Sequence, residues 1–419
     1  MDAFIINGGN KLNGEVAIQS AKNSVLLLMA GAILTDEDVI IRKCPRILDV
    51  FCMIDILKGL NCKVYWVNND ELFINAKEIK NVNLCGDLCG KMRASIFLLG
   101  ALISRFGQVR IAYPGGCKIG ERPINIHLNM LKALGCEVFY FHNEVLCKLT
   151  KKKCATYCFP KISVGATENA ILSTIFFNGR VRFINCAKEP EIVDLQNFLN
   201  KMGANVRGAG TNVVEVDGVK KLHGIEYIPI NDRIELGTFL IATAICGGKI
   251  RLFNANKQNI CYLIDKILNN TCKISMENDI MNITVCGKRC LPKFIETAPY
   301  PYFPTDLQSQ YLSMALFANG SCMIKENVFQ TRFSNVEELQ KMGAKIFRID
   351  NCVYVEGKQK LNGANLISRD LRGGAGLVLA GLGVKDVSIL TGIEFIDRGY
   401  FDFEGKLSQL GANIKRIKM

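Results

Sequence analysis

Two kinds of apolar segment alternate along the chain. The first is a run of roughly a dozen apolar and small residues, which is too long for a buried strand and apolar on nearly every side. Such a run predicts a buried helix. Six of these helices are expected, and they begin near Lys22, Arg93, Thr167, Glu235, Asp306 and Arg372. Most of them end in a glycine-containing turn followed by an apolar strand, as at 178–184 and 247–253.

The second pattern is the end of a helix, a glycine or asparagine, a strand, a polar turn and a second strand. Glycine or asparagine at that place permits the left-handed backbone that ends a helix. The pattern recurs at intervals of 68 to 74 residues, and its copies begin near 57, 131, 199, 267, 339 and 407. Such self-similarity indicates a repeat architecture. Each unit is predicted to be βαβαββ with two helices.

The two ends of the chain complement each other. The last copy stops at Met419 before its second strand, and residues 1–21 are strand-like without a unit of their own. We therefore expect residues 1–21 to complete the sixth unit. The predicted fold is α/β, with two domains of three units each around buried helices. The first domain is 22–229, the second is 1–21 plus 230–419, and the active site is expected in the cleft between them.

The charge and the cysteine content of the chain indicate which classes of ligand it binds. The net charge of +13 is spread along 419 residues without a nucleic-acid module, which favours small anionic ligands over nucleic acid. The 18 cysteines show neither a C-x-x-C pair nor zinc spacing, so most are predicted to be buried thiols in a reducing cytoplasm, with no metal. The apolar run at 25–34 is too short to span a bilayer, and no membrane partner is expected.

Cations gather at the starts of the predicted helices. Helix N-termini present free N–H groups and a positive dipole, so cations placed there favour a polyanionic ligand. The cations at the helix starts that bear on a ligand site are Lys22, Arg93, Lys161 and Arg372, with Arg46, Arg122, Arg332 and Arg398 near the second helices. Asp306 and Asp370 fit two roles that do not exclude each other, as N-caps and as carboxylates that accept a proton among cations.

Cys117 has a setting unlike that of the other cysteines. It lies in "YPGGCKIGERP", on a glycine-rich loop with Lys118 and Arg122 close behind. Nearby cations lower the pKa of a thiol, and a position on a flexible loop makes the thiol accessible. Cys117 is therefore a candidate nucleophile or proton donor, or else one more incidental cysteine. No histidine or asparagine follows in the relationship of a thiol protease.

These motifs carry a family resemblance over essentially the whole chain. The chain resembles the bacterial UDP-N-acetylglucosamine enolpyruvyl transferase family in "NKLNGEVAI", "SAKNS", "MRASIFLLG", "PGGCKIGERP", "ISVGATENA", "EPEIVD", "NDRIELGTFL", "FPTDLQ", "SRDLRGG" and "DRGY". The resemblance implies an inside-out α/β barrel. It also implies transfer of the enolpyruvyl group of phosphoenolpyruvate to the 3-hydroxyl of UDP-N-acetylglucosamine, with release of phosphate. No metal, cofactor or obligate protein partner is implied.

The resemblance also implies roles for individual residues. The residues expected to bind phosphoenolpyruvate are Lys22, Asn23, Arg93, Arg122 and Arg398. Those expected to bind the UDP-sugar are Arg122, Pro123, Ile124, Asn125, Ile126, Lys161, Ile162, Ser163, Val164, Asp306 and Val328. Arg332, Asp370 and Arg372 would complete the second-domain wall. The catalytic residues would be Asp306, which takes the proton of the sugar hydroxyl, Cys117, which protonates the enol methylene carbon, and Lys22.

Two alternatives stay open. The shikimate-pathway enolpyruvyl transferase shares the fold and phosphoenolpyruvate, but it lacks the "PGGCKIG" loop. A non-catalytic homologue that binds UDP-sugars is the other alternative. It rests on Ser20 and Asn125, which stand where the resembling family usually has glycine and aspartate.

Overall fold

The computed structural model describes residues 2–419 except 81, 85–89, 91, 116–122, 288–289 and 330. By its internal contacts the chain divides into two compact units. Leaving those positions aside, the Lys22 unit comprises 20–115 and 123–230, and the Asp306 unit comprises 2–19 and 231–419. The two units are described separately below.

The Lys22 unit consists of helices enclosed by three four-stranded sheets. Its helices are α1 (Lys22–Ala32), α2 (Leu48–Gly59), the 3-10 helix η1 (Arg93–Ile96), α4 (Phe97–Phe106), α5 (Asn125–Ala133), α6 (Val164–Thr174) and α7 (Pro190–Lys201). Its strands are β3 (Val39–Ile41), β4 (Lys63–Trp66), β5 (Leu72–Asn75), β6 (Asn83–Leu84), β7 (Gln108–Ala112), β8 (Cys136–Phe141), β9 (Glu144–Leu149), β10 (Thr156–Cys158), β11 (Arg180–Ile184), β12 (Asn205–Arg207), β13 (Val213–Asp217) and β14 (Ile225–Tyr227). The sheet orders are β14-β3-β5-β4, β6-β7-β9-β8 and β10-β11-β13-β12.

The Asp306 unit has the same plan. Its helices are α8 (Arg233–Cys246), η2 (Lys257–Ile260), the π-helical η3 (Leu263–Leu268), η4 (Thr305–Leu307), α9 (Gln308–Phe317), α10 (Val336–Lys341), α11 (Leu371–Gly383), α12 (Glu394–Asp397) and α13 (Phe403–Gln409). Its strands are β1 (Asp2–Asn7), β2 (Leu12–Ala17), β15 (Gly248–Phe253), β16 (Cys272–Glu277), β17 (Ile280–Val285), β18 (Phe294–Glu296), β19 (Cys322–Lys325), β20 (Ile346–Ile349), β21 (Cys352–Val355), β22 (Asn365–Ile367), β23 (Val387–Thr391) and β24 (Asn413–Lys418). The sheet orders are β16-β17-β15-β2, β18-β19-β21-β20 and β22-β23-β1-β24.

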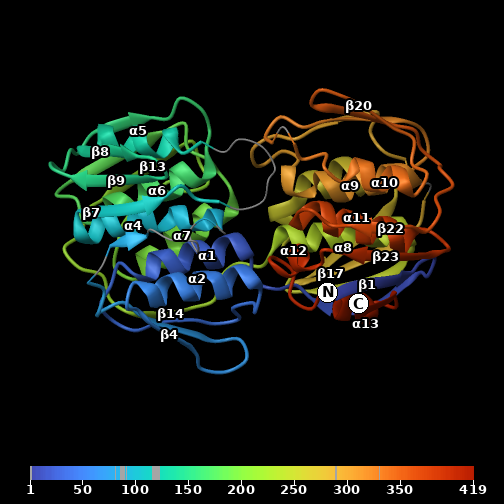
Figure 1. Cartoon of the computed structure of the whole chain (residues 1–419), viewed down its shortest axis with the longest axis horizontal. Helices are drawn as coiled ribbons and strands as arrows, with labels where there is room; N and C mark the ends of the chain where they lie inside the picture. The colour runs from blue at the N-terminus through green and yellow to red at the C-terminus, as the bar shows by residue number, and fades with distance from the viewer. Residues whose placement is uncertain are drawn as a thin grey trace. The chain divides into compact units, whose positions relative to one another are not determined.

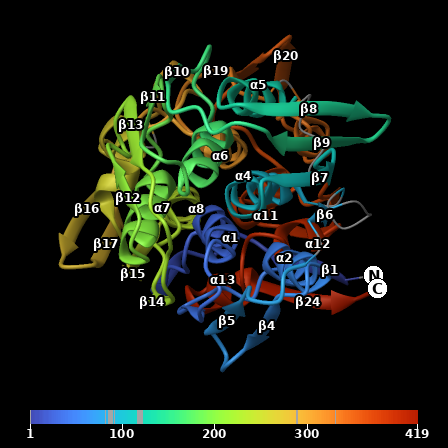
Figure 2. The ribbon, with the colours of Figure 1, turned by 90° about the vertical axis from the view of Figure 1, so that its left-hand side faces the viewer.

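In each unit the sheets face outwards and three helices fill the centre. Figure 1 shows α8, α9 and α11 together inside the Asp306 unit, and these three helices pack on one another. In the Lys22 unit α4 packs on both α1 and α6, and β8 and β9 lie outside them (Figure 2). The central helices are apolar on all sides, as in α8, where nearly every residue is buried. The structure thus confirms the inside-out α/β arrangement.

Glycine allows the central helices to approach closely. A Cβ on Gly100 would lie 2.7 Å from the backbone oxygen of Asn169, and the Gly100 N–H donates to Asn169 Oδ1 at 2.7 Å. In the Asp306 unit a Cβ on Gly376 would lie 2.7 Å from the backbone oxygen of Ser309. A side chain at either position would push two central helices apart. These contacts hold the helix starts of each unit close together.

The predicted helix ends agree with the structure in five of the six copies. Gly135, Gly203, Gly343, Gly411 and Asn61 all have positive φ angles directly after their helices. The fourth copy differs, because its chain runs through the π-helical η3 and Asn269 stays in the right-handed region. The six central helices begin within four residues of their predicted starts.

The expectation for residues 1–21 is right only for the first strand. β1 pairs with β23 and β24 and completes the sixth sheet. β2 instead runs parallel to β15 in the fourth sheet, with Gly248 opposite Leu12. β14 likewise closes the first sheet beside β3. The first, fourth and sixth sheets are therefore each completed by a strand that is distant in sequence from the rest of the sheet.

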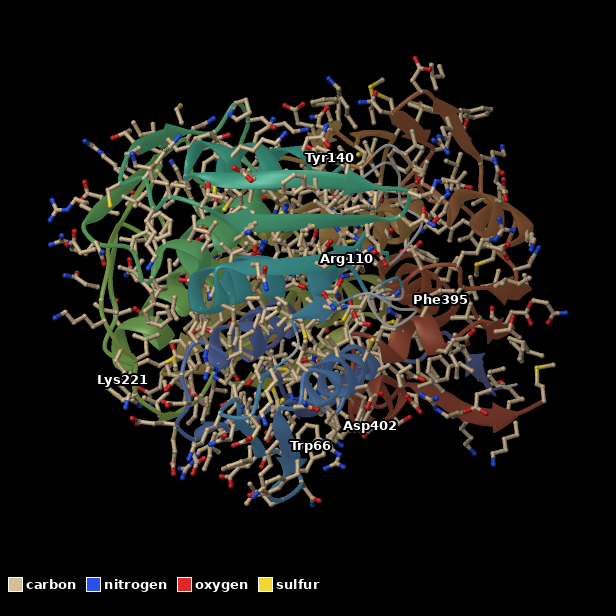
Figure 3. All side chains as sticks on the ribbon, turned by 60° about the vertical axis from the view of Figure 1, so that its left-hand side comes forward. Trp66, Arg110, Tyr140, Lys221, Phe395 and Asp402 are labelled. Atoms are coloured by element: carbon tan, nitrogen blue, oxygen red, sulfur yellow. The ribbon has the colours of Figure 1, made fainter. Side chains whose placement is uncertain are left out.

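The outer faces of the sheets are mainly polar and partly aromatic. Figure 3 shows Tyr140 and Arg110 on the sheet β6-β7-β9-β8. Tyr140 is 56% exposed and accepts a hydrogen bond from Lys132 Nζ, while Arg110 pairs with Glu144 at 2.7 Å. Among the described helices none is long and apolar enough to cross a membrane.

Candidate active site

Asp306 forms ion pairs with two arginines of the Asp306 unit. It lies in the short 3-10 helix η4 that leads into α9. Its Oδ1 lies 2.6 Å from Arg332 Nη2 and its Oδ2 lies 3.1 Å from Arg372 Nη2. The two arginine side chains are 3% and 5% exposed, whereas the Asp306 side chain keeps 25% of its surface. One partly open carboxylate is thus held by two buried guanidinium groups.

The electrostatics of this cluster favour the carboxylate form. Burial by itself would raise the pKa of Asp306, but Arg372, Arg332 and the more distant Arg233 hold that pKa well below its usual range. The Nε atoms of Arg332 and Arg372 are buried, and no hydrogen-bond acceptor for them exists among the described residues. Buried donors without acceptors are costly, and a bound anion would satisfy them. The cluster therefore has the chemistry of an anion site with a carboxylate in it.

Asp370 has a different role from Asp306. Its Oδ1 accepts the N–H groups of Arg372 at 3.0 Å and Gly373 at 2.9 Å, so it is the N-cap of α11. Its Oδ2 accepts a hydrogen bond from Ser334 Oγ at 2.8 Å. Asp306 makes no such cap in η4. Of the two roles open to these aspartates, Asp370 takes the structural one and holds the start of the helix that carries Arg372.

Arg398 and Val328 lie in the same unit. Arg398 is half-buried at the C-terminal end of α12. The loop after it is held by Gln19, whose Nε2 donates to the Gly399 carbonyl and whose Oε1 accepts the Phe401 N–H, both at 2.9 Å. Val328 is 42% exposed. Both residues therefore have the accessibility that substrate contact requires.

Lys22 and Asn23 begin α1 in the Lys22 unit. Lys22 is buried, and its Nζ lies 2.5 Å from Asp49 Oδ2, in the first turn of α2. Asn23 is exposed. Ser20, just before the helix, is buried, and its Oγ has no hydrogen-bond partner among the described residues. Sequence analysis missed Asp49, and no local motif marks it, because it lies 27 residues from the lysine it contacts.

His127 of α5 contacts the first two turns of α6. Asn169 Nδ2 lies 3.1 Å from His127 Nδ1, and a Cβ on Gly165 would lie 3.2 Å from His127 Cε1. Burial, and then the charge of Arg93, lowers the pKa of His127 to about 3, so its ring is neutral. Sequence analysis assigned no role to this histidine. Its position on α5 could have marked it as the contact between two proposed substrate segments.

These two helix starts carry the proposed UDP-sugar residues of the Lys22 unit that the structure describes. Ser163 caps α6 by accepting the Ala166 N–H at 3.4 Å. The exposed residues at the two helix starts are Pro123, Asn125, Lys161, Ile162 and Val164. Ile126 is half-buried, and Ile124 is buried at 3% exposure, so any role of Ile124 must use its backbone. Cys117 and Arg122 lie outside the described residues.

Glu168 is a further buried titratable group of the Lys22 unit. Glu168 of α6 is buried, and its Oε2 has no hydrogen-bond partner within the described part of the chain. Burial, together with Glu191 and Glu189, raises the pKa of Glu168 well above its ordinary value.

The described cysteines are all free thiols, but only seven are buried, fewer than expected. The described residues include no cluster of three His, Cys, Asp or Glu side chains that could hold a metal.

Comparisons with known proteins agree with the fold. Residues 6–407 match the family described as EPSP synthase (3-phosphoshikimate 1-carboxyvinyltransferase). The enolpyruvyl transferase NikO from Streptomyces tendae has the same fold, with a TM-score of 0.87 at 23% identity over 99% of both chains. The EPSP synthase from Acinetobacter baumannii gives a TM-score of 0.74 at 17% identity over the full length of both chains. The fold is that of the carboxyvinyltransferases.

Sequence comparison defines the family more closely. The chain is 44% identical to UDP-N-acetylglucosamine 1-carboxyvinyltransferase 2 from Caldanaerobacter subterraneus, over 100% of both chains. It is 42% identical to UDP-N-acetylglucosamine 1-carboxyvinyltransferase 1 from Clostridium acetobutylicum, again over 100% of both. The chain belongs to the UDP-N-acetylglucosamine 1-carboxyvinyltransferase family.

Proposed function

We propose that this protein transfers the enolpyruvyl group of phosphoenolpyruvate to the 3-hydroxyl of UDP-N-acetylglucosamine and releases phosphate. In bacteria this reaction is the first committed step of peptidoglycan synthesis. The observation that carries the proposal is the Asp306 carboxylate, which lies between two buried arginines whose Nε donors have no acceptor among the described residues. The full-length relatives at 42–44% identity support the same acceptor.

The proposed reaction has an addition step and an elimination step. In the addition, Asp306 takes the proton of the sugar 3-hydroxyl. The oxygen of that hydroxyl forms a bond to C2 of phosphoenolpyruvate. Cys117 gives a proton to C3 in the same step. In the elimination, the Cys117 thiolate takes a proton back from C3, the double bond forms again and the C2–O bond to phosphate breaks. Fixed cations stabilise the departing phosphate.

The proposed substrate contacts draw on both units. Lys22, Asn23, Arg93, Arg122 and Arg398 would bind phosphoenolpyruvate. The residues proposed for the UDP-sugar are Pro123 to Ile126 and Lys161 to Val164, with Arg122, Asp306 and Val328. The residues at the starts of α5 and α6 support this assignment, because their side chains are exposed. A helix N-terminus also favours an anion such as the diphosphate of the UDP-sugar.

The low pKa of Asp306 connects binding with catalysis. A carboxylate held so firmly in its charged form is a weak base in the empty site. An anionic substrate bound by Arg332 and Arg372 would offset part of their charge, and the pKa of Asp306 would then rise. Proton transfer would therefore become easier only once the substrate is bound, because the same arginines serve both groups.

The proposed substrates and the free thiols indicate in which cellular compartment the protein acts. Both substrates are phosphorylated metabolites of the cell interior, and free thiols persist in a reducing compartment. We therefore propose that the protein acts in the cytoplasm without a nucleic-acid or membrane partner.

Phosphate release tests the function directly. The purified protein is given phosphoenolpyruvate with UDP-N-acetylglucosamine and, separately, with shikimate 3-phosphate. We expect release with the UDP-sugar alone. Release with shikimate 3-phosphate would assign the shikimate-pathway reaction instead. Binding of the UDP-sugar without any release would indicate a non-catalytic homologue and direct attention to Ser20 and Asn125.

A further inference from the structure

Glu326 is a buried carboxylate in the Asp306 unit that no step of the proposed reaction uses. It directly follows β19 and is 2% exposed. Four hydrogen bonds converge on its side chain. Oε1 accepts Thr297 Oγ1 at 2.8 Å and the N–H groups of Val328 at 2.8 Å and Phe329 at 3.0 Å. Oε2 accepts Thr305 Oγ1 at 2.9 Å.

The four donors come from three separate segments. Thr297 directly follows β18, Val328 and Phe329 form the turn after β19, and Thr305 begins η4. Charge-assisted hydrogen bonds of this kind are stronger and more directional than neutral ones. A carboxylate that satisfies four donors therefore fixes three segments relative to one another.

Two of these segments hold the ion pairs at Asp306. Thr305 precedes Asp306 directly in η4, so its bond to Glu326 fixes the base from one side. On the other side the Phe329 N–H is held by Glu326, and the Phe329 carbonyl accepts the Arg332 N–H at 3.2 Å. Glu326 thus fixes the backbone next to the proposed base and the backbone that leads to its arginine partner.

We propose that Glu326 is a positioning residue for the transfer reaction, and this inference rests on the proposed function. It holds Asp306 in register with Arg332 through Thr305, and it holds the Val328 backbone where the UDP-sugar is proposed to bind. Glu326 itself touches no reacting atom. Because small displacements of a catalytic group reduce turnover strongly, loss of the Thr305 bond should lower kcat more than it changes KM.

Two threonine variants separate positioning from mere stability. Thr305→Val and Thr297→Val each remove one hydroxyl donor from the same carboxylate. Only Thr305 adjoins Asp306. Loss of a hydrogen bond to a charged group corresponds to roughly ten-fold in rate when the bond acts in catalysis. We expect Thr305→Val to lower kcat for phosphate release about ten-fold and Thr305→Ser to restore it. Thr297→Val should leave kcat within about two-fold of the wild type.

A binding measurement needs no turnover. Calorimetry with UDP-N-acetylglucosamine compares Glu326→Ala with Glu338→Ala, in which a second buried carboxylate of the same unit is lost (1% exposed). We expect Glu326→Ala to weaken binding about ten-fold through the Val328 turn, Glu326→Gln to recover most of it, and Glu338→Ala to bind normally.

The outcomes distinguish this inference from the proposed function. If the wild-type protein releases phosphate and the two valine variants have equal kcat values, the role of Glu326 is refuted and the function stands. If the wild type releases none, the function fails, and the calorimetry alone decides. Equal UDP-sugar affinity in Glu326→Ala and the wild type then refutes the inference, and selective weakening supports it.

Discussion

Replacement of Asp306 by asparagine changes the charge of the cluster but hardly its shape. The amide leaves the Arg332 and Arg372 side chains buried, at 3% and 5% exposure, without the charge that both contact. Removing one partner of a buried ion pair costs about 3–5 kcal/mol, and we take about 3 because the carboxylate is one quarter exposed. For a unit of this size that corresponds to a fall of roughly 6–12 °C in Tm.

The same substitution should remove the proposed base. General base catalysis contributes roughly 10²–10⁴-fold, so kcat for phosphate release should fall at least about 100-fold. Binding of phosphoenolpyruvate should persist or strengthen, since the arginines are released for the anion. Added phosphoenolpyruvate should therefore raise the Tm of Asp306→Asn more than that of the wild type. The assays are phosphate release and thermal unfolding with and without phosphoenolpyruvate.

Asp217 offers a matched control. Its side chain is also 25% exposed, and it also lies between two arginines, Arg180 and Arg207. Those arginines are 55% and 53% exposed, so Asp217→Asn leaves no buried charge behind. Its Tm and kcat should stay close to wild-type values. Our reasoning is refuted if Asp306→Asn keeps most of its turnover, or if the two variants lose stability equally.

Further predictions concern Cys117 and the Lys22 unit. Cys117→Ser should lose most turnover yet bind UDP-N-acetylglucosamine in calorimetry, and fosfomycin, an epoxide phosphonate, should label Cys117 alone among the 18 cysteines in peptide mass spectrometry. Labelling spread over several thiols would contradict a specially activated Cys117. Asp49→Asn should lower the unfolding free energy in urea by about 3 kcal/mol, because Lys22 loses a buried ion pair; a variant as stable as the wild type would disprove this. The folded-state pKa of His127 is lowered to about 3, so wild-type stability should fall, by on the order of 4 kcal/mol, as the pH drops from about 6.5 towards 3. His127→Gln should flatten this dependence in urea titrations, and an unchanged slope would refute the assignment.

Local patterns predicted the architecture well because they act over short distances. Apolar runs marked the six central helices, and glycines such as Gly203 and Gly343 marked the left-handed turns that end helices. The place of β2 could not be read in the same way, because its partner β15 lies more than 230 residues away. A strand pattern shows that a segment needs a sheet, but not which sheet receives it.

The sequence indicated the residue types of the candidate site but not the contacts between them. Asp306 and the arginines stood out because a carboxylate among cations is unusual at helix starts. Glu326 did not stand out, because its four donors come from residues 297, 305, 328 and 329, and none of them forms a motif with it. Asp49 was missed for the same reason. Positioning residues act through long-range contacts, which a pattern along one chain does not contain.

Equivalent helix starts in the Asp306 unit use the same residue type for different purposes. At α8, Asp232 accepts the N–H groups of Ile234 and Glu235, and at α11 Asp370 caps its helix in the same way. Backbone donors hold one oxygen of each of these carboxylates. At η4 the preceding residue is Pro304, and the Asp306 carboxylate contacts arginines instead of backbone. An anionic substrate can compete for arginines but not for a helix cap. Of these three aspartates, therefore, Asp306 is the one whose basicity a substrate can change.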